Sequence, residues 1–286
     1  MNTATHSFIT RPPADLAGWL LRFDATQLPV LASTAQFIVD WRLTEDAADA
    51  HNLAQTLAAD PLMMLKLLAH VAALRRGREG SEPETATQAL VMLGITPFFS
   101  AFGPQPVAQD WLAHDEAALA GFLNVLRRSH RAASFAIGFA AHRMDHDAAV
   151  IHEAALLHDF AEMLLWLHAP ALALDIQQRQ QADPTLRSAA VQRTVLGIEL
   201  AELQQALMRT WRLPRLLREI TDSQALARAQ AGHTQLRNVL LAIRVARHSA
   251  LGWDNAALPD DISDIAQLLH LSLDATQRLL LDIDAD

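Results

Sequence analysis

Apolar residues recur three and four positions apart along almost the whole chain, the spacing that places them on one face of an α-helix. Between them the chain is rich in Ala, Leu, Gln, Glu and Arg, which lose little entropy in helices. The segment Asp115 to Arg143 shows the longest stripe, formed by Leu119, Phe122, Leu126, Ser129, Ala133, Ile137 and Ala140. The pattern predicts an all-α fold of about a dozen helices, with a long buried helix here and no substantial sheet.

Proline and glycine interrupt this pattern at regular intervals. Asp60-Pro61 fits a helix start with proline in the first turn, and Leu213-Pro214 fits a break between two helices. Loops are expected over residues 77–83 and at Thr96-Pro97.

The strongest interruption is Gly103-Pro104-Gln105-Pro106, and we place a boundary between two helical lobes near it. The expected organisation is one compact two-lobed unit without repeats or long linkers. Its parts are a partly helical N-terminal extension (1–27), an N-terminal helical lobe (28–105) and a C-terminal helical lobe (106–286).

Composition narrows the functional classes. The chain has 286 residues, 51% of them hydrophobic, which is ample for a continuous core. The net charge of −9, with arginines scattered among acids, argues against a general nucleic-acid binder, because phosphate binding needs a concentrated basic face. The arginine runs 75–78 and 127–131 are more typical of solvated helix faces.

The sequence contains no cysteine, so disulfides, thiolate metal sites and cysteine nucleophiles are excluded. No apolar run approaches the roughly 18 residues of a membrane-spanning helix, and residues 1–24 do not read as a secretory signal. We therefore expect a cytoplasmic protein without a membrane partner.

Phosphate-binding and nucleophile motifs are missing. The glycines are too dispersed for a dinucleotide fingerprint or a P-loop, and no G-x-S-x-G elbow occurs. Thirteen histidines remain as candidates. His142, Asp145 and His146 could converge near a helix end, but a helix cap at Asp145 or Asp147 in a solvated loop explains them more simply.

The adjacent residues His158 and Asp159 are more informative, because they lie inside an apolar segment that predicts a helix, near the middle of the C-terminal lobe. A buried carboxylate is costly unless it is paired or coordinated. In metal hydrolases adjacent His and Asp can both reach an ion that activates water and clamps phosphate oxygens. The alternative is a paired Asp159 in a hydrogen-bonded core.

The segment Leu156-Leu157-His158-Asp159 resembles the L-L-H-D-I-G-K stretch of HD-type phosphohydrolases. Its surroundings resemble the HDOD (HD-related output domain) family over roughly residues 28–253. The matching pieces are Leu28-Pro29, Asp60-Pro61, Leu65-Lys66-Leu67-Leu68, Gln88 to Gly94, Val195 to Leu203 and Trp211-Arg212-Leu213-Pro214. The order and spacing of these pieces are more specific than any one of them.

The chain departs from the pattern of active HD enzymes at the metal-binding positions. The first histidine of those enzymes aligns with Arg128, beside His130, and the later histidine aligns with Leu200, on an apolar stripe with Leu203, Leu207 and Trp211. The His-His pair aligns with Asp222-Ser223, and the final aspartate aligns with Arg247. Two surviving groups are too few for a catalytic metal site, so no metal or other cofactor is expected. The alternative is a rearranged site to which His130 and Asp222 contribute.

The two arginines suggest how Asp159 is neutralised. We expect Arg128 or Arg247 to pair with Asp159, because the guanidinium fork matches a carboxylate. By helical periodicity, an Arg128 side chain that simply faces solvent is an equal alternative.

The resemblance implies a non-enzymatic bacterial signalling or regulatory module that acts through protein partners. A first alternative is a sensor that holds a nucleotide or another phosphorylated ligand with Arg128, His130 and Arg247 in the former active-site cleft. A second is a metal-dependent phosphohydrolase or cyclic-nucleotide phosphodiesterase using His158 and Asp159.

Overall fold

The computed structural model describes residues 7–43, 50–76, 83–183, 185–222 and 234–285. The all-α prediction is confirmed, since the protein is 73% helical. Within the described ranges the only β-type pairing is an isolated bridge between Val30 and Val107. The helices are more numerous than the expected dozen, because short helices such as α1 (Leu16–Leu20), α7 (Ala108–Trp111) and α14 (Arg215–Ile220) are hard to see in a periodic pattern.

The residues group into two compact units, and the chain passes from one to the other more than once. The first unit comprises residues 1–125 and 160–213, and the second comprises residues 126–159 and 214–286. This grouping differs from the expected lobes, because the residues on both sides of Gly103-Pro104-Gln105-Pro106 fall in the first unit.

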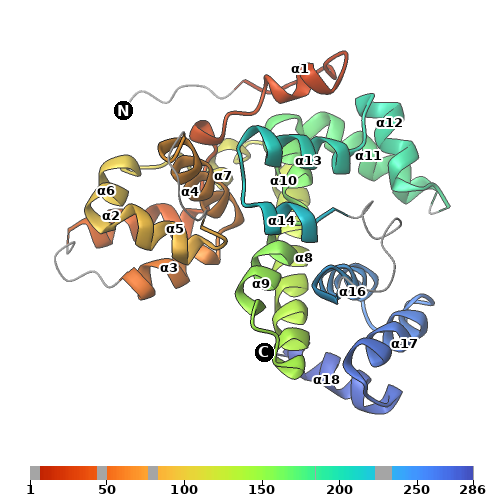
Figure 1. Ribbon diagram of the computed structural model, residues 1–286. Helices are drawn as coiled ribbons and strands as arrows, with labels where there is room; N and C mark the ends of the chain where they lie inside the picture. Colours follow the sequence, from red (N-terminus) through yellow and green to blue (C-terminus); the bar gives the residue numbers. More distant parts are fainter. Residues whose placement is uncertain (1–6, 44–49, 77–82, 184, 223–233, 286) are drawn as a thin grey trace. The chain divides into compact units, whose positions relative to one another are not determined.

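The first unit contains α1, the 3-10 helix η1 (Ala25–Gln27) and the helices that follow up to residue 125. These are α2 (Ala32–Arg42), α3 (Ala50–Ala58), α4 (Pro61–Leu74), α5 (Ala86–Leu93), α6 (Ile95–Ala101), α7 and the start of α8 (Glu116–Arg143). The same unit also contains α10 (Phe160–His168), α11 (Pro170–Ala182), α12 (Ser188–Leu196) and α13 (Leu200–Thr210), which Figure 1 draws in green to teal.

Helix α4 is buried over most of its length, and its start follows the predicted chemistry. The Asp60 carboxylate accepts hydrogen bonds from the backbone N–H groups of Leu62 and Met63, and Pro61 occupies the first turn. A second oxygen of Asp60 accepts from the backbone N–H of Leu31, which ties α4 to the chain before α2. The expected loop at Thr96-Pro97 is wrong, because Pro97 lies in the first turn of α6, where its missing N–H is not needed.

The second unit holds the rest of α8 together with α9 (Ala148–Leu157), α14, α16 (Thr234–His248), α17 (Leu258–Leu269) and α18 (Leu273–Ala285). The long buried helix predicted after Asp115 is confirmed as α8. Helix α16 packs against both α9 and α17, so it is central to this unit (Figure 1). The predicted break at Leu213-Pro214 is also confirmed, between α13 and α14.

No single described helix is long and apolar enough to cross a membrane. Residues Asn52–Ala58 and Pro61–Leu74 meet the length and hydropathy criteria only when taken together, and a bend of 116° separates them.

Candidate functional site

Asp159 lies in a turn between two helices rather than inside one. Helix α9 ends at Leu157, His158 caps it, and α10 begins at Phe160. The prediction of a continuous helix here is wrong because both flanking helices are buried on nearly every side, so the apolar pattern continues across the break. The predicted burial is confirmed for Asp159, which is 7% exposed, whereas His158 is half-buried.

Both oxygens of the Asp159 carboxylate are bound by arginines. Oδ2 accepts from Nε and Nη2 of Arg128 on α8, at 2.9 and 2.8 Å. Oδ1 accepts from Nη2 of Arg247 on α16, at 2.6 Å, and lies 3.0 Å from Nδ1 of His158. The structure thus contains both expected Arg–Asp pairs, and the alternative of a solvent-facing Arg128 is wrong.

The electrostatics keep Asp159 ionised. Burial alone would raise the pKa of its carboxyl group. The nearby Arg247, Arg128 and His158 outweigh this effect and together hold the pKa well below its ordinary value. Through Asp159, the ion pairs with Arg128 and Arg247 link the α9–α10 turn to α8 and to α16 within the second unit. Removing one partner of such a buried pair is costly, because the remaining charge stays desolvated.

The other predicted site residues lie in different surroundings. His130 is half-buried on α8 and acts electrostatically on His152 of α9, whose pKa is lowered by burial and by His130. Leu200 begins α13 in the first unit and is buried with Leu203 and Leu207, as its apolar stripe predicts. Asp222 is half-buried just after α14, and Ser223 lies outside the described residues.

These residues do not fit a divalent metal centre. Among the described residues, no group of three or more His, Asp or Glu side chains is placed to hold an ion. Asp159 already receives hydrogen bonds from two cations. Asp145, which was considered for a metal, pairs with Arg143 instead. Asp147 is the N-cap residue of α9, but its carboxylate accepts from Gln235 rather than from the backbone of the helix.

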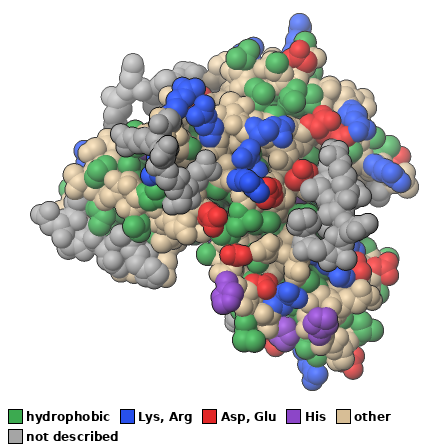
Figure 2. All heavy atoms as spheres, in the orientation of Figure 1, with side chains coloured by type: hydrophobic (Ala, Val, Ile, Leu, Met, Phe, Trp, Pro, Cys, Tyr) green, Lys and Arg blue, Asp and Glu red, His purple; other side chains and the backbone are tan. Residues whose placement is uncertain are grey.

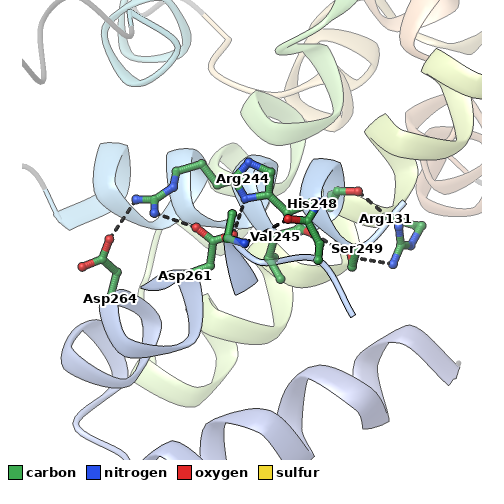
Figure 3. A network of polar contacts seen from close by, with 10 residues as sticks. Arg131, Arg244, Val245, His248, Ser249, Asp261 and Asp264 are labelled. Atoms are coloured by element: carbon green, nitrogen blue, oxygen red, sulfur yellow. Dashed lines mark hydrogen bonds and ion pairs between the residues drawn. The ribbon is translucent and has the colours of Figure 1, made fainter. Parts of the chain in front are cut away.

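A second polar network lies on the side of α16 that faces α17 (Figure 3). Arg244 contacts the buried carboxylate of Asp261 at 2.6 Å and the partly exposed carboxylate of Asp264 at 2.8 Å. His248 Nδ1 lies 2.5 Å from Asp261 Oδ2. In the sequence this network is visible only as basic residues at 244, 247 and 248 and as acidic residues in the first turn of α17. Helix α16 therefore holds Asp159 through Arg247 and α17 through Arg244 and His248.

Two arginines of the run 127–131 take part in ion pairs. In Figure 2, the basic side chains on the face shown are interspersed with acidic and hydrophobic ones. Of the run 127–131, Arg128 holds Asp159, and Arg131 pairs with Asp284 at 2.7 Å and donates to Ser249. These two side chains are therefore engaged within the second unit rather than displayed as a solvated basic face.

Comparison with solved structures supports the same fold. The response regulator MmoQ from Methylococcus capsulatus str. Bath is 19% identical, with a TM-score of 0.67 over 89% of this chain and 98% of that chain. A virulence factor from Campylobacter jejuni subsp. jejuni is 18% identical, with a TM-score of 0.62 over 95% and 94%. An HDOD domain protein from Geobacter sulfurreducens is 14% identical, with a TM-score of 0.51 over 94% and 92%.

No curated protein matches the chain. The family model of the HDOD domain matches residues 28–226, well over half of the sequence. That range contains Arg128, His158 and Asp159, and Arg247 lies beyond it. The chain therefore belongs to the HDOD family.

Proposed function

We propose that the protein is a non-enzymatic signalling or regulatory module that acts through protein partners. One observation carries the proposal: Asp159, the surviving acid of the His-Asp pair, has both oxygens bound by arginines. Family membership supports the signalling part, as does the fold shared with MmoQ, which is described as a response regulator.

Metal-assisted hydrolysis needs an ion held by several anionic or neutral ligands, with one position left open for water. Here two guanidiniums bind the carboxylate that would serve as a ligand, and their charges repel a cation. The ion-paired centre instead braces three elements of the second unit. This is the role of a rigid platform for binding rather than of a catalytic centre.

An anion sensor at the same place is a weaker alternative. Arg128 offers two donors to Asp159, so its fork is already filled by a carboxylate. His130 interacts with His152. An incoming phosphate would have to displace Asp159 from at least one guanidinium.

The test of the non-enzymatic part compares the wild type with His158→Gln and Asp159→Asn. Each purified protein is analysed for bound metal and assayed with p-nitrophenyl phosphate and cyclic nucleotides in the presence of Mn²⁺, Ni²⁺ or Fe²⁺. We expect no stoichiometric metal and no turnover above that of the variants. The matched control is His114→Gln, which removes an exposed imidazole elsewhere.

Metal-dependent turnover that is retained in His114→Gln but lost in His158→Gln would overturn the non-enzymatic part. The His158 variant matters because the Asp159 variant is expected to be less stable, and loss of folding could imitate loss of activity. The partner part is tested by crosslinking in the native cell, followed by titration of the purified candidate. A saturable complex is expected, and the absence of any saturable partner would contradict it.

A further inference from the structure

A cavity of about 400 Å³ lies within the first unit, where α4, the segment after α6 and the end of α13 meet. Its volume falls in the range of about 300–1,000 Å³ that is usual for small-molecule sites. Every residue that lines it belongs to residues 24–105 or 210–212, so the cavity is built by this unit alone and is separate from Asp159.

Lys66 forms part of the cavity wall and is the only lysine in the sequence. It is 5% exposed, and its Nζ donates to the backbone carbonyl of Leu28 at 2.6 Å and to Oε1 of Gln105 at 2.5 Å. Both acceptors are neutral, and an ammonium group has three donors. The buried cation therefore has a third donor, and no carboxylate of the described residues is in hydrogen-bond contact with it.

Two further cations line the same cavity. Arg76 follows the end of α4 and Arg212 follows the end of α13, and both are exposed. Within the described part of the chain, neither guanidinium pairs with a carboxylate. The acid on the cavity wall, Asp24, uses Oδ1 to accept from the backbone N–H and hydroxyl of Thr26. The cavity thus has an excess of positive charge.

Three of the other lining residues carry aromatic rings. His70 lies on α4 one turn after Lys66 and packs edge-on against Phe102, with ring centroids 5.1 Å apart. Trp211 contributes to the wall from the end of α13 and packs against Phe160, at 5.8 Å. Burial lowers the pKa of His70, so its ring is a neutral surface near pH 7. Aromatic faces favour a planar ring as a partner.

We propose that this cavity binds a small phosphomonoester that carries one planar ring, with the size of a nucleoside monophosphate. Arg76 and Arg212 bind the phosphate oxygens as paired donors, which suits the guanidinium fork. Lys66 binds the ligand from the cavity wall. The ring lies against Trp211, Phe102 and His70.

The experiment measures binding of AMP, GMP, adenosine and inorganic phosphate to the full chain by calorimetry. The variants are Arg76→Gln, Arg212→Asn and the two combined. Arg212 has a φ of 54°, a conformation that asparagine tolerates. The matched control is Arg75→Gln, which removes the neighbouring charge without lining the cavity. Both arginines are exposed, so the variants should fold.

We expect saturable binding of a nucleoside monophosphate, about tenfold weaker in each single variant and unchanged in Arg75→Gln. A second readout uses protein labelled with ¹⁵N-lysine, in which a single residue gives the signal. This signal should shift with the same titration midpoint.

Three results would overturn the proposal. The first is no saturable binding of either monophosphate at millimolar concentration. The second is binding of adenosine or of inorganic phosphate as tightly as the nucleoside monophosphate. Tight binding of adenosine would show that the phosphate is not recognised, and tight binding of inorganic phosphate would show that the ring is not recognised. The third is affinity that does not change in the combined variant.

Discussion

The cations of the two units are used in opposite ways. In the second unit, Arg128 and Arg247 meet the buried carboxylate of Asp159. In the first unit, Lys66, Arg76 and Arg212 line a cavity without a carboxylate partner among the described residues. A guanidinium placed against a buried acid has its donors occupied, whereas one that lines a cavity without a carboxylate partner can bind a ligand. Residue type alone does not distinguish the two cases.

The largest effect is expected when Asp159 is removed from the closed site, which is the centre formed by Asp159, Arg128 and Arg247. We expect Asp159→Ala to lower the free energy of unfolding by about 2–3 kcal/mol, because it leaves two cations unpaired, discounted for the partly exposed Arg247. Urea unfolding measures the change. As a control, Asp175→Ala breaks the exposed pair with Arg179 and should cost less than about 0.5 kcal/mol.

Replacing all three charges sharpens the same test. The variant with Arg128→Met, Asp159→Leu and Arg247→Met should regain stability to within about 1 kcal/mol of the wild type, because no unpaired charge remains. If the triple variant is as unstable as Asp159→Ala, the cost is one of packing rather than of unpaired charge. Equal losses of unfolding free energy in Asp159→Ala and Asp175→Ala would show that the buried ion pair contributes no more to stability than the exposed one.

Acid should weaken the closed site. The folded-state pKa of Asp159 lies well below the unfolded value of about 3.9, so its stabilisation is fully present above that value and is lost as the pH falls toward the folded pKa. Urea unfolding at pH 7, 5, 4 and 3 should show the gap between the wild type and Asp159→Asn constant at first and shrinking below about pH 4. A gap that is independent of pH would contradict the ionised pair.

Raising the pH should weaken ligand binding at the open site, which is the cavity lined by Lys66, Arg76 and Arg212, and this effect should be smaller. Burial lowers the pKa of Lys66 to about 8, although the carboxylates of Asp60 and Asp24 raise it in part. Its other neighbours are the neutral groups of Leu28 and Gln105. The charge that attracts a phosphomonoester is therefore present below about pH 8 and is lost above it, and affinity should fall a few-fold between pH 7 and 9.

Calorimetry at the two pH values measures this loss, and Lys66→Met should bind more weakly with little further change between them. The sequence has no cysteine or tyrosine, whose ordinary pKa values lie in or near the same range. The phosphate itself is already mostly a dianion at pH 7, and further ionisation would raise rather than lower its affinity for a cationic site. An affinity that does not change from pH 7 to 9 would show that the charge of Lys66 does not contribute to binding.

Periodicity and helix punctuation predicted much of the fold. The stripe after Asp115 predicted α8, and Asp60-Pro61 predicted the start of α4. Two errors have a common cause, since local patterns do not record where a buried chain bends or starts a short helix. The α9–α10 turn is hidden by apolar residues on both sides, and Pro97 is compatible with a loop or with a first helical turn.

The ion-paired centre was predictable because a buried Asp beside two aligned arginines has few other ways to be neutralised. The cavity was not, because it joins α4 to the end of α13 across more than a hundred residues of sequence. Its one visible signal is Lys66, a single lysine within the apolar run of α4. Its partners, Leu28 and Gln105, are neutral and carry no pattern of their own.

The burial of the only lysine also affects how the protein can be modified. A side-chain amine is the target of acetylation and of ubiquitin-type attachment. Here the only such amine is 5% exposed and is held by two hydrogen bonds. Because Lys66 also lines the cavity, the rate of its acylation should report access to the amine through the cavity as well as local opening of α4.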